Sequence, residues 1–573
     1  MPVSPDLPVT GPTGQDSSGL APRVKPGRAA SDSGEPVGPA SASTGPGAAR
    51  AAAWVFALVV VMGLGYIQLW VPGSGWFAGD DWLLLTDGTR LSFNTLTADI
   101  NGHWVLVPRA MFSALWWLVG LEHYWPYKLV AVLGHGAVVV LLRAVMRRAG
   151  VRPWTATLLA STFLVLGAGG ENILYPLQVA LTGALACGLA HLLLADQVVP
   201  TRRRDVAGLA VGATGLMFSG LALPMTLAVG VVVLARRGWR AAMFHSVPIA
   251  VGYIAWASSV DANRITAAPP SPTTVLSFVT EGQKALLTAL AGGHAILALL
   301  FGMVLLGAGA LALLPVLRLP DGRSSARLDL VRIHAVPIAL WCAALFFNAL
   351  LARNIYYLGP SAVWAIRYVY IGAALGLPIL AVAGDALARR VPRAGVAFIV
   401  LALLPVPSNV HLLQSLRFAP FNPVDDARVV RLAVRVPFAH DVDPAVRPIP
   451  DKAHPGVTIG YLLGTAEQGR LDPGTSLLTQ ADIGEMRVRL GFAGEPVAKV
   501  PVPCRALALP ATLRPDVGDR FVISGPVVVV SHEAGGESGR KVLRGDFARE
   551  SVKAQLPGME LKVSGTGPLC ELG

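Results

Sequence analysis

Two adjacent carboxylates, Asp80 and Asp81, follow the first long apolar run of the sequence and stand beside Trp76, Phe77 and Trp82. A carboxylate can take a proton from a hydroxyl group. Just past a membrane span, such a pair can meet a substrate that has a polar head and an apolar tail. This acidic turn is therefore the first candidate for chemistry. Asp is also a favoured N-cap residue, so Asp80 can instead begin a short helix at Asp81, and one role does not exclude the other.

The composition is that of a membrane protein. Of the 573 residues, 53% are hydrophobic and only 14% are charged, whereas about 25% charged residues are typical of soluble proteins. Apolar runs of roughly 17–25 residues recur, and these can cross a bilayer as helices. The net charge of +12 does not indicate a nucleic-acid partner, because residues 410–573 hold 19 Lys and Arg against 18 Asp and Glu. The excess therefore lies in the short loops between apolar runs, as the positive-inside rule requires.

The order of these runs predicts a polytopic α-helical membrane protein with about eleven transmembrane helices. Residues 1–50 are rich in Pro, Gly, Ser and Ala, and we expect a disordered cytoplasmic segment there. Residues 51–410 form the membrane module, whose first span is Ala51–Val71. Residues 206–234 are too long for one span and are predicted to break at Ser219-Gly220 and Pro224 into two short helices. Basic residues in alternate loops place the acidic turn and the C-terminus outside.

Two intervening segments carry more specific predictions. Residues 103–119 form an amphipathic pattern that contains Trp104, Trp116 and Trp117, which is typical of a helix lying on the membrane surface. His135 falls within the second span. A buried hydrogen-bonding role is favoured there over a ligand role, although ionisable residues at membrane depth are functional candidates.

Residues 411–573 are predicted to be an extracytoplasmic β-rich domain, because short alternating stretches are separated by Gly, Pro and Asp turns. A helix around residues 425–434 is expected to connect this domain to the membrane module. Cys504 and Cys570 lie in the domain, and we expect a disulfide between them if the compartment is oxidising. Cys187 and Cys342 lie inside apolar runs.

Several short motifs in the outward loops resemble those of the GT-C glycosyltransferases, polytopic enzymes that take a sugar from a polyprenyl-phosphate carrier. The residues that carry the resemblance are Asp80-Asp81, His103-Trp104, Pro108, Tyr127-Lys128-Leu129, the turn from Glu171 through Asn172 to Gln178, and Arg367-Tyr368-Val369-Tyr370. Each motif is short, and the signal is their joint order on one predicted face over residues 51–410.

The resemblance implies an inverting transfer of a sugar to an extracytoplasmic glycan, lipid or protein of the cell envelope. The base would be Asp80 or Asp81. Arg367 would bind the donor phosphate, because a guanidinium matches it in a bidentate manner and Tyr368 adds a hydroxyl donor. Arg353 is a second candidate for that role, and Arg367 can alternatively anchor to lipid headgroups.

His103, Glu171, Asn172 and Gln178 are further candidate site residues on the same resemblance. Some members of this superfamily use a divalent metal, and carboxylates suit Mg or Mn. Asp80, Asp81 and Glu171 are too few to define a metal site, so metal dependence stays open.

Two other functions remain open at this stage. A transporter or flippase of lipid-linked sugars would share the membrane topology, although no inverted repeat is evident and no charged residues are found in mid-span beyond histidines. A non-catalytic scaffold that presents the C-terminal domain is the third. The convergence of the outward carboxylates with Arg367 would favour the enzyme.

Overall fold

The computed structural model describes residues 46–573, except 89–91, 101, 198, 261–268, 318–323, 417–422, 450–455, 497–504, 509, 524–526, 534–540, 545–549, 566–568 and 573; in some helices and strands it describes only the backbone. The predicted disordered segment falls almost wholly outside these residues. Its last five residues belong to the first helix, which begins at Pro46 rather than Ala51.

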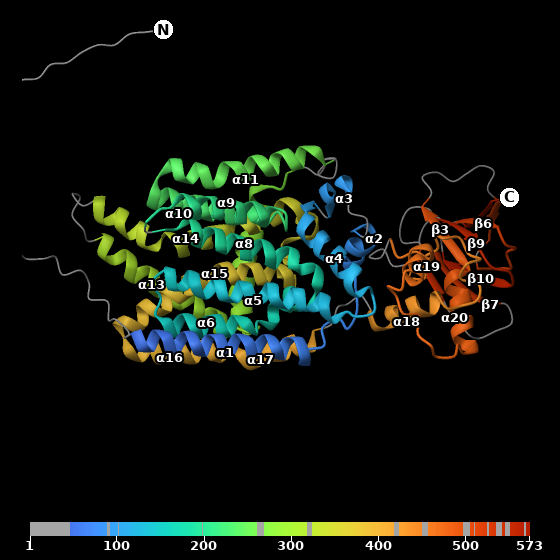
Figure 1. Cartoon of the computed structure of the whole chain (residues 1–573), viewed down its shortest axis with the longest axis horizontal. Helices are drawn as coiled ribbons and strands as arrows, with labels where there is room; N and C mark the ends of the chain where they lie inside the picture. Colours follow the sequence, from blue (N-terminus) through green and yellow to red (C-terminus); the bar gives the residue numbers. More distant parts are fainter. Residues whose placement is uncertain are drawn as a thin grey trace, which may run out of the picture. The chain divides into compact units, whose positions relative to one another are not determined.

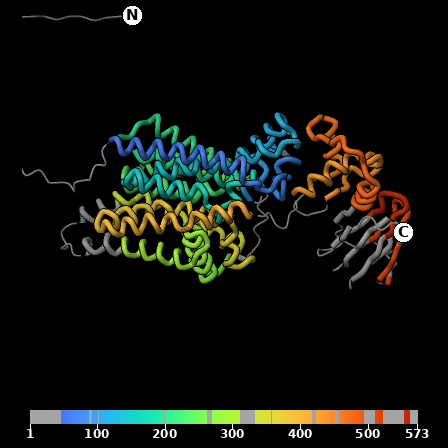
Figure 2. Tube along the Cα trace, turned by 90° about the horizontal axis from the view of Figure 1, so that it is seen from below, coloured from blue at the N-terminus to red at the C-terminus, as the bar shows by residue number. Residues whose placement is uncertain are grey.

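The described membrane module is a bundle of apolar helices whose long axes are roughly aligned (Figure 1, Figure 2). Seven helical stretches in the described residues are long and apolar enough to cross a membrane, and the number reaches nine if each of two bent helix pairs is one span. The chain is therefore a polytopic helical membrane protein. The helices of the bundle are α1 (Pro46–Trp70), α5 (Trp125–Arg148), α6 (Pro153–Leu164), α7 (Gly170–Leu174), α8 (Val179–Ala195), α9 (Arg202–Leu216), α10 (Ala222–Arg237), α11 (Trp239–Ser259), α12 (Pro272–Leu290), α13 (Ala295–Leu317), α14 (Ser324–Ile355), α15 (Ile366–Arg390), α16 (Pro392–Leu403) and α17 (Val406–Ser415).

The predicted break at Ser219-Gly220 is confirmed, because α9 ends at Leu216 and α10 begins at Ala222. Pro224 does not mark a break, since it lies in the first turn of α10, where proline is tolerated. These two helices have 15 and 16 residues, somewhat short for the ~20 residues that usually span a bilayer. The predicted total of eleven spans counted each of them as one.

Two helix pairs are sharply bent, and two neighbouring residues of α17 each form a hydrogen bond with one of the bends. The axes of α6 and the segment Gly167–Leu174 differ by 56°, and those of α12 and α13 by 107°. The Asn409 side-chain oxygen accepts a hydrogen bond from Ala168 N at 3.3 Å. Its neighbour Ser408 donates to Gly292 O, which lies in the α12–α13 turn, at 2.6 Å. Polar groups freed by the bends are thus paired inside the protein, as burial in a bilayer requires.

His135 satisfies a third backbone group at the first bend. Its Nε2 donates to Leu164 O at 3.0 Å, and its Nδ1 accepts from the Tyr370 hydroxyl at 2.8 Å. The tautomer follows from the carbonyl, which can only accept. The ring is fully buried, so the predicted role as a buried hydrogen-bonding residue is confirmed.

Short elements follow α1 before the bundle continues. They are α2 (Asp81–Gly88), α3 (Phe93–Thr97), the paired strands β1 (Asp99–Ile100) and β2 (His103–Trp104), and α4 (Leu106–Val119). The predicted amphipathic helix exists as α4, but its first two residues belong to β2. Trp117 is 53% exposed, and Trp116 is buried, so α4 has one apolar face toward the protein and one away from it. Short 3-10 helices occur at η1 (Gly167–Gly169), η2 (Pro176–Gln178), η4 (Tyr356–Leu358) and η5 (Pro360–Trp364).

The tail begins with helices rather than strands. These are α18 (Pro423–Ala433), α19 (Ile459–Glu467) and α20 (Gln480–Leu490). The helix expected around residues 425–434 is confirmed by α18, but the prediction of β-rich structure from residue 411 is wrong as far as Leu490. Thr458 caps α19, and Thr479 forms a capping box with Asp482 at the start of α20, so these helices carry start signals that the alternation pattern concealed.

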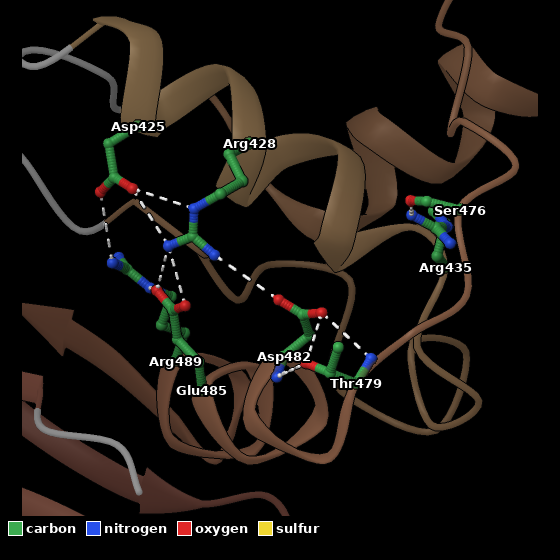
Figure 3. Close-up of polar contacts among 8 residues, drawn as sticks. All are labelled: Asp425, Arg428, Arg435, Ser476, Thr479, Asp482, Glu485 and Arg489. Carbon is green, nitrogen blue, oxygen red and sulfur yellow. Dashed lines mark hydrogen bonds and ion pairs between the residues drawn. The ribbon is translucent and has the colours of Figure 1, made fainter.

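An ion-pair network joins α18 to α20 (Figure 3). Arg428 contacts Asp425 at 3.0 Å and Glu485 at 2.8 Å, and Arg489 contacts Glu485 at 2.8 Å. Because these side chains are between 26% and 45% exposed, each pair contributes little to stability by itself. The network mainly fixes the angle between the two helices.

All described strands of the tail follow α20. They form a four-stranded sheet in the order β5-β10-β7-β8 and a five-stranded sheet in the order β3-β9-β6-β11-β4, and every pair described is antiparallel. The strands are β3 (Phe492–Pro496), β4 (Arg505–Leu507), β5 (Ala511–Leu513), β6 (Arg520–Ile523), β7 (Val527–Glu533), β8 (Lys541–Arg544), β9 (Glu550–Ala554), β10 (Met559–Gly565) and β11 (Leu569–Leu572). The predicted disulfide involves Cys504 and the side chain of Cys570, which lie outside the described residues.

Candidate functional site

The acidic turn opens α2 inside an aromatic cluster. The rings of Trp76, Phe77 and Trp82 lie 5.5–5.6 Å from one another, and Phe77 also stacks edge-on against Tyr127 at 4.8 Å. Phe77 and Trp82 are fully buried. The aromatic residues that follow the first apolar run therefore form a packed core under the turn, and they fix the position of α2.

The two carboxylates of the turn differ in their surroundings. Asp81 is fully buried and forms the first residue of α2, whereas Asp80 immediately precedes the helix and is partly exposed. The Asp81 oxygens accept hydrogen bonds from Ala78 N at 3.3 Å and Leu177 N at 3.1 Å. Burial raises the pKa of Asp81 well above its ordinary value, and the two backbone hydrogen bonds oppose this rise only in part.

Tyr175 hydrogen-bonds the loop after α7 to the acidic turn. Its hydroxyl accepts the backbone N–H of Asp81 at 3.2 Å and donates to Ala78 O. The Asp81 carboxylate in turn reaches Leu177 N. The two loops thus hold each other through reciprocal contacts over nearly a hundred residues of sequence. Burial raises the pKa of the Tyr175 hydroxyl well above its ordinary value, so it remains a donor.

The loop after α7 also contacts Arg367, the residue predicted to bind the donor phosphate, through Gln178 and Glu171. Gln178 Nε2 donates to Glu171 Oε1 at 2.9 Å, and Arg367 Nη1 forms an ion pair with the same oxygen at 3.1 Å. The Arg367 guanidinium also lies 5.1 Å from the centre of the Tyr368 ring. The Arg367 side chain is 44% exposed, and that of Glu171 is 17% exposed. The structure therefore brings together Glu171, Gln178, Arg367 and Tyr368, and it joins them through residues 175–178 to Asp81.

Asn172 lies next to Glu171 in α7 and is fully buried. Within the described part of the chain, neither its amide nitrogen nor its amide oxygen has a hydrogen-bond partner. A buried amide without partners is costly, so Asn172 is an unexplained polar group beside the Glu171–Arg367 pair.

His103 belongs to a different neighbourhood. Its ring faces the Ser219-Gly220 turn, since a side chain added at Gly220 would come within 3.1 Å of His103 Nδ1. The adjacent Trp104 stacks on Trp256 of α11, with ring centres 5.9 Å apart. Burial lowers the pKa of His103, against the opposite effect of Asp99. The structure thus groups His103 with the ends of α9 and α11, and Arg353 lies in the last turn of α14.

The described residues do not present an evident metal site. Within them, no group of three or more His, Cys, Asp or Glu side chains is placed to hold a metal ion. Asp81 is engaged by backbone N–H groups and Glu171 by Arg367, so two of the three carboxylates named from the sequence are committed to other contacts.

Two residues have structural roles in this region that the sequence did not reveal, although Lys128 belongs to one of the motifs named above. Tyr175 lies in a predicted loop, and nothing in its local pattern indicates that its hydroxyl hydrogen-bonds the acidic turn. Lys128 Nζ donates to Ile67 O and Gln68 O at 3.0 Å each, and also to Val71 O. It thereby pairs the last carbonyls of α1, where a cation is favourable, and sets the start of the acidic loop.

Comparison with known proteins does not extend this description. No protein-family model matches the chain, and no curated protein sequence matches it.

Proposed function

We propose that the chain is a membrane glycosyltransferase that moves a sugar from a polyprenyl-phosphate donor to an extracytoplasmic acceptor. In this proposal it has about eleven spans, the N-terminus is cytoplasmic, and the acidic turn and the tail face outward. The observation that carries the proposal is the continuous chain of contacts from Asp81 through Tyr175–Gln178 to the Glu171–Arg367 pair. This connection supports the proposal, in which the acidic turn supplies the proton acceptor and Arg367 binds the donor phosphate.

In the proposed reaction Asp80 is the base. It takes the proton from the acceptor hydroxyl while the oxygen attacks the anomeric carbon, and the bond from that carbon to the phosphate oxygen breaks. The leaving polyprenyl phosphate gains negative charge. Arg367 stabilises this charge, because its fork of N–H donors fits phosphate oxygens and its exposed side chain can reach a ligand.

Asp81 and Glu171 have positioning roles in the proposal. Asp81 is buried and already accepts two backbone hydrogen bonds, so it fixes the turn that carries Asp80. Glu171 orients the Arg367 guanidinium through a single 3.1 Å contact. The guanidinium also contacts Tyr368, and because the Arg367 side chain is 44% exposed its remaining N–H donors can reach the phosphate.

The test is glycosyl transfer in membranes from a panel of radiolabelled polyprenyl-phosphate sugars, at matched expression. Asp80→Asn should lower the rate by about 10²–10⁴-fold. Arg367→Lys should raise the KM for the donor more than it lowers kcat, because a lysine keeps the charge but loses the fork. Asp472→Asn is the matched control, since Asp472 is an exposed carboxylate in the tail. Full transfer by Asp80→Asn would end its assignment as base.

A transporter or flippase of lipid-linked sugars is the second candidate. The two bent helix pairs, which are hydrogen-bonded to the neighbouring residues Asn409 and Ser408 of α17, favour it, since broken helices form the binding sites of many transporters. If no donor gives transfer but the purified chain moves a labelled lipid-linked sugar across proteoliposomes, this second function stands instead.

A further inference from the structure

A cluster of arginines lies at the end of the bundle where α9 begins and α10 ends. Arg202, Arg203 and Arg204 form the first turn of α9, and Arg240 lies in the first turn of α11. All four side chains are exposed. These four residues are called the α9 basic patch. None of them belongs to the site proposed above.

The acids beside the patch are already paired with other arginines. Asp196 is buried and contacts Arg148 at 3.0 Å and Arg236 at 2.6 Å. Asp205 forms a two-pronged pair with Arg237 at 2.7 and 2.8 Å, and it also accepts from His245 Nε2 at 3.3 Å. The positive charge of the α9 basic patch is therefore not neutralised by Asp196 or Asp205.

Helix stability does not explain the three arginines of α9. The N-terminal end of a helix carries partial positive charge, so cations in the first turn are unfavourable. Asp205 is the only residue of that turn with the favourable sign. The arginines thus lie where the helix itself gains nothing from them, which points to a partner with negative charge.

The surroundings of the patch indicate where that partner lies. Trp239 is 64% exposed and lies under the Arg240 guanidinium at 5.5 Å. One turn further along α9 and α11, the exposed residues become apolar: Val206 is 51% exposed and Met243 is also 51% exposed. An exposed tryptophan that lies beside basic residues, one turn from an apolar band, is typical of the bilayer interface.

We propose that the α9 basic patch binds the headgroups of anionic phospholipids in the surrounding bilayer. The arginines supply bidentate donors to the lipid phosphates, and the apolar band of α9 and α11 contacts the acyl chains. Zwitterionic lipids present the same phosphate, but their cationic groups offset the attraction to four arginines, so the patch discriminates by net lipid charge.

The experiment uses the full-length protein in a neutral detergent. Phosphatidylglycerol or phosphatidylcholine with identical acyl chains is added, and both the thermal unfolding midpoint and the lipids retained in native mass spectrometry are measured. Phosphatidylglycerol should raise the midpoint more than phosphatidylcholine and should be retained, and raising the salt concentration should weaken the preference. The triple variant R202Q/R203Q/R204Q should lower the apparent affinity for phosphatidylglycerol by about a hundredfold.

The control triple variant K284Q/R514Q/R520Q removes the same charge from exposed residues elsewhere. It should keep the wild-type preference. A preference that both triple variants lose equally would reflect net charge alone and would overturn the proposal, as would an absent preference in the wild type. If R202Q/R203Q/R204Q does not fold, Arg203→Gln alone should still lower retention, and unchanged retention by that variant would likewise overturn it.

Discussion

Asp80 and Asp81 are adjacent in the chain, but the first turn of α2 points them into different surroundings. Asp81 is enclosed by the aromatic cluster and by the loop that contains Tyr175, whereas Asp80 keeps partial exposure. A carboxylate that acts on a substrate needs access, and one that fixes a loop needs partners. The difference in burial therefore separates the two residues more clearly than their order in the sequence.

The raised pKa of Asp81 leads to a prediction for stability. A carboxyl group whose pKa is higher in the folded state than its unfolded value of about 3.9 contributes stability that is present below that value and is lost as the pH rises through the folded pKa. Asp81→Asn cannot ionise. The unfolding midpoint of the wild type should therefore fall relative to that of Asp81→Asn as the pH rises above about 4.

The measurement is thermal unfolding of the full chain in detergent over this pH range. Asp472→Asn serves as the control, because Asp472 is exposed, and its profile should follow the wild type. Parallel profiles for wild type and Asp81→Asn would contradict the prediction.

Loss of the Glu171–Arg367 pair should affect the donor KM more than the unfolding midpoint. The Arg367 side chain is 44% exposed and that of Glu171 is 17% exposed, so solvent partly screens the pair and its contribution is about 1 kcal/mol. Glu171→Gln should therefore leave the unfolding midpoint nearly unchanged. If the proposed function is correct, the same change should raise the KM for the donor several-fold, because the guanidinium loses its orienting partner. A large fall in the midpoint would show that the pair is mainly structural.

At the scale of elements, the bend between α6 and α7 depends on close backbone contact with α17. A side chain at Gly167 would lie 1.9 Å from Asn409 O, which leaves no room for a methyl group. Glu171 lies one turn after the bend, so the bend determines that Glu171 meets Arg367. Position 167 therefore requires glycine because a larger side chain would clash with α17, and not because of its backbone conformation.

Gly167→Ala should destabilise the protein by several kcal/mol, because the obstructing atom belongs to the backbone and α17 would have to move. Gly65→Ala is the matched control. Gly65 lies within α1 with no atom within 4 Å of an added Cβ, so alanine there should be neutral or slightly stabilising. Thermal unfolding of both variants checks this. Equal midpoints would show that α17 does not press against the bend.

At the scale of the molecule, the tail helices share a hydrophobic core with the acidic loop. Trp82, Leu85 and Trp116 belong to the same buried cluster as Leu462 and Met486 of α19 and α20. Backbone contacts reinforce it, because Leu121 N donates to Arg470 O at 2.6 Å. Movement of these tail helices would therefore disturb the packing of the aromatic core around Asp81.

Gly120 is the point of closest approach in this contact. Its φ of +62° favours glycine, and an added Cβ would lie 2.3 Å from Arg470 O. Gly120→Ala should weaken the contact, and hydrogen exchange at the Leu121 amide should become faster by at least tenfold. Gly464→Ala is the control, since Gly464 lies in α19 with no atom near an added Cβ. Unchanged protection at Leu121 would contradict the predicted contact.

The predicted orientation and disulfide also belong to this scale. Tags at residues 30 and 560 should report the cytoplasm and the exterior respectively, as the distribution of basic residues requires. Tags that report the same side would show an error of one in the number of spans. Two free thiols at Cys504 and Cys570 in unreduced protein would remove the disulfide alone.

The sequence by itself determined the membrane class, the break at Ser219-Gly220, the helix at α18 and the buried role of His135. These features depend on composition or on local patterns, which report whether a segment is apolar and where it bends. Helical structure from Ile459 to Leu490 escaped that reasoning. The prediction of strands rests on alternating stretches further along the chain, at residues 520–524 and 527–531, and extends over the whole tail, although the caps of α19 and α20 favour helices.

Only the tertiary structure decided which residues of the candidate site meet. Asp81 and Leu177 are 96 residues apart in sequence, and Glu171 and Arg367 are 196 apart. A periodic pattern shows that one face of an element is buried but not which residues lie against that face. It could not reveal the hydrogen bonds of Tyr175 to the acidic turn or those of Lys128 to the end of α1. The division between buried Asp81 and accessible Asp80 has the same origin, because burial here is produced by segments distant in the chain.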